Sequence, residues 1–203
     1  MNTVEKYITG LKKAYLDNDA KESWEHFENI KQGASKEDLA ALKKIYPDIP
    51  ETLMHLLEYV DGTYWREYAG EEIAFYFLGS DVEEYQYPYY LLSSRGMIEN
   101  QHIATEYYSD YLERKYEEVE IDDKITSKVE TVKWLHFSDC MNNGGTSQLF
   151  IDFSPSEKGK RGQIVRFLHD PDEFAVIADS FEDYLKMLID HEYAFINEDT
   201  VEE

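Results

Sequence analysis

Several features that common folds and chemistries depend on are scarce or absent in this sequence. Its 203 residues include one cysteine, Cys140, so no intramolecular disulfide can form, and a reducing compartment is compatible with that usage. No run approaches the roughly 18 apolar residues of a membrane helix, and the first residues lack the apolar centre of a signal peptide. Zinc-finger spacings and glycine-rich phosphate loops are also missing. We therefore expect a cytoplasmic protein with no membrane contact.

Basic residues are also scarce relative to acidic ones. Lys and Arg total 20 against 43 Asp and Glu, for a formal charge of −23. A nucleic-acid-binding surface needs clustered Lys and Arg, so this composition argues against a nucleic-acid partner. Either the charge only keeps the protein soluble, or it favours a basic protein partner.

The acidic excess is concentrated in one segment that is also rich in tyrosine. Residues 67–123 contain 15 acidic and 3 basic side chains, a net of −12, and 10 of the 17 tyrosines lie between Tyr68 and Tyr116. Tyrosine is enriched in interface cores, so this segment is predicted to be a recognition surface. For any single ring, packing inside the domain is the simpler interpretation. The proposed partner-binding residues are Glu83, Glu84, Tyr85, Tyr87, Tyr89 and Tyr90.

The segment 134–188 has the clearest secondary-structure signals. Alternating or continuous apolar residues between turn-forming residues predict an antiparallel meander, followed by a helix with a capping box at Ser180 and Asp183. The predicted strands are 132–137, 147–153, 164–168 and 174–177, with a turn at 142–145, and the helix carries apolar residues from 181 to 189.

The rest of the chain is predicted to be largely helical. Apolar residues recur at helical spacing in 4–15, 24–30, 39–45 and 53–60, and as a longer pattern in 98–116. Ser35 is expected to cap the third helix, Pro50 to start the fourth, and Gly62 to end it in a left-handed conformation. A strand is predicted at 73–78, an edge strand around Pro88, and a frayed tail beyond His191.

Two groups of polar residues contain side chains of the types used in catalysis or metal binding. Cys140 lies near His136, Asp139 and Asn142, but catalytic bases normally come from distant sequence, and a small buried cysteine is the simpler reading. His169, Asp170, Asp172 and Glu173 surround Pro171 and match no calcium-loop spacing, so a polar turn is favoured over a metal site. The adjacent pairs Glu71-Glu72 and Glu83-Glu84 point apart. No catalytic residue, cofactor or metal is therefore expected.

Several short motifs follow one another in a particular order. A capped helix, Ile49-Pro50-Glu51 and a helix ending Tyr59-Val60-Asp61-Gly62 come first, and the strands and capped helix of 134–188 follow. This order resembles the Smi/Knr family of the SUKH superfamily, with Asp61 where the family pattern has Asn. The similarity spans about residues 34–189, with a long middle at 81–123. The residues that carry the family pattern are Pro50, Gly62, Gly144, Gly145, Asp152, Pro155, Ser180, Phe181 and Leu185.

This resemblance implies an α+β fold with N-terminal helices and a C-terminal helix packed on a mainly antiparallel twisted sheet. It also implies a non-enzymatic protein-binding domain, in bacteria an immunity protein that neutralises a polymorphic toxin, with a regulatory scaffold for cell-wall assembly or signalling as the alternative. We expect a helical extension at 1–33, one domain at 34–190 with an acidic insertion at 81–123, and an acidic tail at 191–203. The expected partner is a basic toxin domain, and the expected state is a monomer or weak homodimer.

Overall fold

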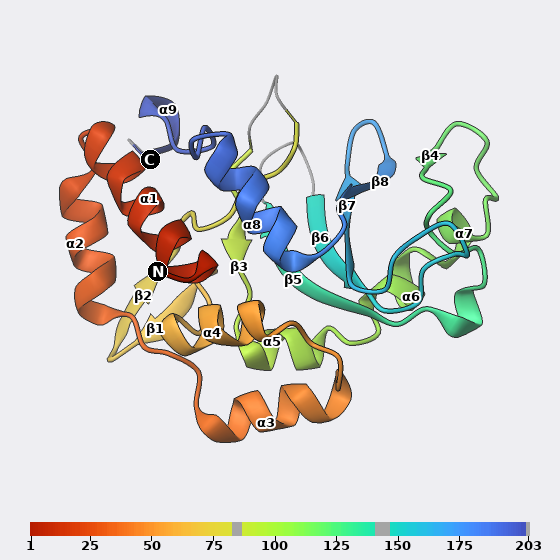
Figure 1. The fold of residues 1–203 in the computed structure, drawn as a ribbon, viewed down its shortest axis with the longest axis horizontal. Coiled ribbons are helices and arrows are strands. Elements are labelled where there is room, and N and C mark those ends of the chain that lie inside the picture. Colours follow the sequence, from red (N-terminus) through yellow and green to blue (C-terminus); the bar gives the residue numbers. More distant parts are fainter. Residues whose placement is uncertain (83–86, 141–146, 202–203) are drawn as a thin grey trace.

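A six-stranded β-sheet is the centre of the fold (Figure 1). The computed structural model describes residues 1–82, 87–140 and 147–201. N-terminal helices and a C-terminal helix pack with the sheet, so the predicted α+β class is confirmed. The strands are β1 (Arg66–Tyr68), β2 (Glu71–Ile73), β3 (Tyr90–Leu91), β4 (Glu120–Ile121), β5 (Trp134–Cys140), β6 (Ser147–Asp152), β7 (Gln163–Leu168) and β8 (Glu173–Ala178). The helices are α1 (Thr3–Asp17), α2 (Lys21–Ile30), α3 (Lys36–Ile45), α4 (Glu51–Tyr59), α5 (Ser94–Glu99), α6 (Ile103–Tyr107), α7 (Ser109–Leu112), the 3₁₀ helix η1 (Val129–Thr131), α8 (Phe181–Asp190) and α9 (Glu198–Val201).

The sheet has the strand order β3-β5-β6-β7-β8-β4. Strands β5 to β8 form the predicted antiparallel meander, while β3 adds antiparallel to β5 and β4 adds parallel to β8. Strand β6 is buried along its whole length because both faces of the sheet are covered. Consecutive residues of β6, such as Leu149 and Phe150, are therefore both apolar. The predicted turn at 142–145 lies outside the described residues.

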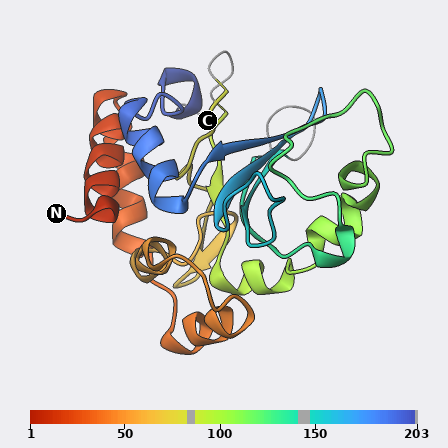
Figure 2. The same ribbon diagram turned by 45° about the vertical axis from the view of Figure 1, so that its right-hand side comes forward.

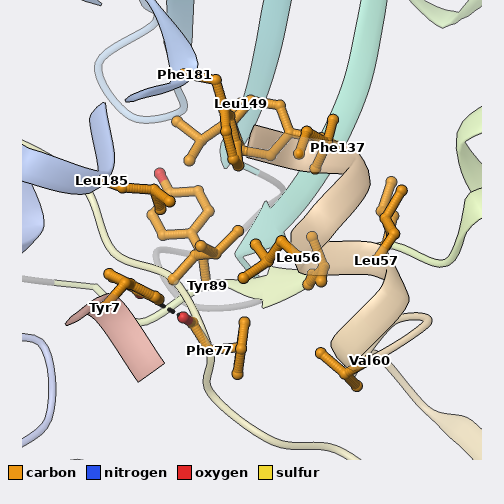
Figure 3. Close-up of a cluster of buried hydrophobic side chains, with 14 of the residues drawn as sticks. Tyr7, Leu56, Leu57, Val60, Phe77, Tyr89, Phe137, Leu149, Phe181 and Leu185 are labelled. Carbon is orange, nitrogen blue, oxygen red and sulfur yellow. Dashed lines mark hydrogen bonds between the residues drawn. The ribbon is translucent and has the colours of Figure 1, made fainter. Parts of the chain in front are cut away.

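Two apolar cores lie on the two faces of the sheet. The larger core joins α1, α2, α3, α4 and α8 to one face, and Figure 3 shows part of it, with Phe137, Leu149 and Phe181 packed together. The smaller core lies under α6 and α7, where Phe150 and Phe174 meet Tyr108. Leu149 and Phe150 are neighbours on β6 and belong to different cores, as the two-residue period of a strand requires.

The predicted helix starts and stops are present. The Ser35 side chain accepts a hydrogen bond from the Asp38 N–H at 3.0 Å, and Ser180 accepts one from the Asp183 N–H at 3.1 Å. Gly62 has φ +92°, the left-handed conformation expected after α4. These local signals worked because each depends on a few adjacent residues.

Three local predictions were wrong. The single helix at 98–116 is divided into α5, α6 and α7, because the chain turns at Asn100 and again at Tyr108. The strand at 73–78 stops at Ile73, and beyond it the backbone is irregular, with hydrogen bonds from Phe75 to Thr63 and from Phe77 to Tyr89 and an isolated bridge between Leu78 and Tyr89. The described part of the tail, up to Val201, does not fray, because apolar residues after His191 return to the larger core. They are Tyr193, Phe195 and Ile196.

The first 33 residues share this larger core. Tyr7 and Leu11 of α1 are fully buried, and Trp24 and Phe27 of α2 are 1% exposed. Helix α1 lies beside α8 in both ribbon views (Figures 1 and 2). The N-terminal helices are therefore part of one apolar interior.

Candidate protein-binding surfaces

The acidic, tyrosine-rich segment 67–123 is divided between two opposite edges of the sheet. Its first part leads into β3 at one edge, and its last part ends in β4 at the other. The hairpin β1-β2 and the helices α6 and α7 are accordingly far apart in Figures 1 and 2. The expectation of one continuous surface is therefore wrong, because the six strands separate the two parts.

We call the surface beside β3 the Trp65 face. We define it by four residues that line a hollow, Trp65, Ala74, Tyr76 and Tyr90, together with the exposed hairpin residues Glu67 and Glu72. Trp65 is 60% exposed and lines a hollow of about 290 Å³ together with Tyr76 and Tyr90. The ring centroids of Tyr76 and Tyr90 are 4.9 Å apart, so the hollow has an aromatic wall.

The proposed partner-binding tyrosines have different environments. Tyr89 has no exposed surface and lies among the core side chains of Figure 3, so its assignment as a partner contact is corrected. Tyr90 is 8% exposed, and burial and its hydrogen bond with Tyr76 raise its pKa. Tyr87 is half-buried against the larger core. The remaining residues of this set, Glu83, Glu84 and Tyr85, lie outside the described residues.

We call the opposite surface the acidic edge. Its exposed side chains are Glu106, Tyr107, Asp110, Glu113, Tyr116, Glu117, Glu118, Glu120 and Asp170. A hollow of about 570 Å³ lies here, lined by Tyr111, Tyr116 and the turn before β8. The Tyr111 hydroxyl donates to the Asp172 carboxylate at 2.8 Å, and this hydrogen bond, with burial, raises the pKa of Tyr111 to about 12.

Lys115 forms ion pairs with two carboxylates of the acidic edge. Lys115 Nζ lies 2.7 Å from Asp110 and 2.6 Å from Glu113. Within residues 1–82, 87–140 and 147–201, no ion pair involves Glu117 or Glu118. A basic partner would therefore meet carboxylates that the chain itself has not neutralised.

Polar side chains of the turn at 169–173 form ion pairs with each other and with Arg166. His169 Nδ1 lies 2.9 Å from Asp172, and Glu173 pairs at 3.1 Å with Arg166, which is 4% exposed. Arg166 also binds Asp81 at 2.6 Å. In the part of the chain that the structure describes, no three His, Cys, Asp or Glu side chains gather as metal ligands. No local residue pattern indicates the buried Arg166 network, because its acidic partner Asp81 is distant in the chain.

The sheet separates Cys140 from His136. Cys140 belongs to the larger core, whereas the His136 ring lies 5.0 Å from the ring of Phe150 in the smaller one. A register shift between His136 and Ser138 precedes the turn. Asn142, the last member of this candidate set, lies outside the described residues. A thiolate–imidazole pair is therefore not formed by these two side chains.

His136 instead belongs to a buried polar network. Its Nε2 lies 3.0 Å from Asp139, and its Nδ1 lies 3.1 Å from the Asn100 side chain. Gln148 donates to Asp139 at 2.9 Å and accepts from the Tyr108 hydroxyl at 2.6 Å. Every member holds another in place, so the network joins α5 and α6 to the sheet.

The residues that carry the family pattern are structural. Asp152 is buried and accepts hydrogen bonds from the Ser154 N–H at 2.7 Å and from Gln163 at 3.0 Å. Phe181 and Leu185 are fully buried. Pro50 precedes α4, and Pro155 follows β6 in the loop toward β7. Gly144 and Gly145 lie outside the described residues.

The sequence pattern of the SMI1/KNR4 family (SUKH-1) matches residues 33–187. The chain belongs to this family. Members of the SMI1/KNR4 family are commonly toxin immunity proteins and generally non-catalytic. Helices α1 and α2 precede the matched residues, although they complete the same core. No curated protein matches the chain significantly. Among the described residues, the helices are too short or too polar to cross a membrane.

Proposed function

We propose that this SMI1/KNR4 protein is an immunity protein that neutralises a basic toxin domain by binding it directly. The observation that carries the proposal is the exposure of carboxylates beside aromatic rings at both sheet edges. Glu117 and Glu118 lie next to Tyr116, and Glu67 and Glu72 lie on the Trp65 face. Such rings provide buried contact area, while the charges select a cationic partner.

The net charge supports the same partner. A chain with a formal charge of −23 repels nucleic acid and attracts a cationic domain. Neutralisation by covering a toxin requires no catalytic group in the immunity protein, in keeping with the separation of Cys140 and His136. We retain Glu83, Glu84, Tyr85, Tyr87 and Tyr90 as proposed contacts.

The test pairs the chain with the toxin domain encoded beside its gene. We expect co-expression to protect cells and the purified proteins to form a complex. Association should slow at least about tenfold between about 0.01 M and about 1 M salt, because the Debye length falls from about 30 Å to about 3 Å. Dissociation should change less.

Charge reversal gives a second measurement. Glu83→Lys with Glu84→Lys should lower the association rate, whereas Tyr90→Ala should raise the dissociation rate. The Tyr90 variant needs a circular-dichroism control for folding, because the ring is largely buried. Absence of a complex, or protection without any complex, would refute direct neutralisation.

A further inference from the structure

We propose that the Trp65 face is an arginine-binding surface. The guanidinium of an arginine in an extended basic segment of a partner protein stacks on Trp65 and pairs with Glu67 and Glu72. This inference rests on the proposed function, because it assumes a basic protein partner. It adds which side chain of that partner is recognised, an arginine, and where it binds, on the Trp65 face.

Two glutamates face each other in the hairpin. The register places Glu67 of β1 opposite Glu72 of β2, and both are exposed. Like charges directly opposite in an antiparallel pair are destabilising. Among the described residues, neither glutamate takes part in an ion pair. A cation between them would relieve this repulsion.

The nearest cation of the chain is committed elsewhere. Arg66 precedes Glu67, but side chains alternate along a strand, and its guanidinium bonds to Asp61 at the other face. It donates to the Asp61 carbonyl at 3.1 Å and lies 3.3 Å from the Asp61 carboxylate. Arg66 therefore does not neutralise the opposed glutamates.

Trp65 adds an aromatic surface beside these charges. It is 60% exposed, whereas Trp24 and Trp134 are 1% and 2% exposed. Its φ of +45° is uncommon for a bulky residue. An exposed tryptophan held in this conformation at the rim of an aromatic hollow has the composition of an interface hot spot.

The spacing fits one long cationic side chain. Trp65 precedes Glu67 by two residues, so their Cα atoms are at most about 7 Å apart. Arginine suits this arrangement better than lysine because its planar guanidinium stacks on an indole and offers several N–H donors to carboxylates. The hollow beside Trp65 can receive the apolar part of a neighbouring partner residue.

The acidic edge differs in one decisive respect. There Lys115 already occupies the position between Asp110 and Glu113. On the Trp65 face the corresponding position between Glu67 and Glu72 has no cation from the described chain. Glu117 and Glu118 of the acidic edge are adjacent in the sequence, whereas Glu67 and Glu72 are opposed across a hairpin, so they supply a control that is matched in charge but not in arrangement.

The experiment uses hexa-arginine and hexa-lysine peptides with the full chain at low salt. The tryptophan fluorescence reports this face directly, because only Trp65 of the three indoles is exposed. We expect hexa-arginine to shift this emission and to protect Trp65 from acrylamide quenching, and to bind more tightly than hexa-lysine.

Two charge-matched variants locate the site. Glu67→Gln with Glu72→Gln should weaken hexa-arginine binding about fivefold or more, and Glu117→Gln with Glu118→Gln less than about twofold. In calorimetry, the Trp65→Leu variant should show a smaller difference in affinity between hexa-arginine and hexa-lysine than the wild type. Circular dichroism checks that each variant folds.

Equal weakening by both pairs, or a larger effect at Glu117 and Glu118, would overturn the inference, as would unchanged Trp65 quenching. These results are independent of toxin neutralisation. A chain that neutralises the toxin without arginine-dependent protection of Trp65 overturns this inference alone. A chain that shows the protection but binds no toxin overturns the proposed function alone.

Discussion

Replacing Tyr7 by phenylalanine tests whether the N-terminal helices are an integral part of the fold. Tyr7 has no exposed surface, and its hydroxyl donates to the Phe77 carbonyl at 2.6 Å (Figure 3). The substitution keeps the ring and removes the donor, leaving a buried carbonyl without this bond. An unsatisfied buried polar group costs about 1–3 kcal/mol, a large part of the roughly 5–15 kcal/mol that stabilises a typical protein.

Urea unfolding measures this loss. With a slope of about 2 kcal/mol per molar urea, a loss of about 2 kcal/mol lowers the midpoint by about 1 M and leaves the slope unchanged. Tyr107→Phe is the matched control, because Tyr107 is 70% exposed and should change stability by less than about 0.5 kcal/mol. Equal midpoints for the two variants would refute the reasoning. So would two separate transitions in the wild type, because α1 would then unfold independently of the sheet.

The same reasoning extends to two other tyrosines. The Tyr15 hydroxyl donates to the Tyr76 carbonyl and the Tyr184 hydroxyl to the Gly79 carbonyl, each at 2.7 Å. Helices α1 and α8 thereby hold the irregular segment that follows β2. These side-chain donors add to the backbone hydrogen bonds that Phe75 and Phe77 make to Thr63 and Tyr89, so the segment is held from both sides without being a regular strand.

Four further outcomes follow from the structure. Gly62→Ala should destabilise the protein more than Gly70→Ala in urea unfolding, because both glycines have positive φ but only a Cβ at Gly62 would lie 2.6 Å from the Ser93 nitrogen. Equal losses would mean that backbone conformation alone matters there. Burial raises the pKa of Asp152 above 3.8, so the folded chain holds a proton that the unfolded chain has released. The wild type should therefore lose stability relative to Asp152→Asn as pH rises through the interval above 3.8, and a gain with pH would reverse the assigned sign. Chelator treatment should leave the melting temperature unchanged, whereas a fall of more than about 5 °C, equivalent to at least roughly 1 kcal/mol at this size, would indicate a structural metal. Cys140→Ala should leave neutralisation of the toxin intact at unchanged folded concentration, and a selective loss would indicate a role for the thiol.

Local sequence signals predicted much of the secondary structure. Ser35 and Ser180 each needed only a backbone N–H three residues away, and Gly62 needed only a left-handed conformation. The strands β5 to β8 followed from residue alternation and from turns between them. These signals are short in range, so they can be read without knowing what packs against them. The order of the family motifs likewise needed only the sequence.

The positions of the candidate surfaces depended on tertiary structure. The β-sheet places β3 and β4 at opposite edges, so one acidic stretch of sequence forms two separate surfaces. Tyr89 and Tyr90 are adjacent in the sequence, yet Tyr89 packs inside the core and Tyr90 reaches the wall of the hollow beside Trp65. The composition of this segment indicated aromatic and acidic groups but could not assign their surroundings. Those surroundings are set by the strand order and by helices packed from distant parts of the chain, because burial depends on contacts that local residue patterns do not contain.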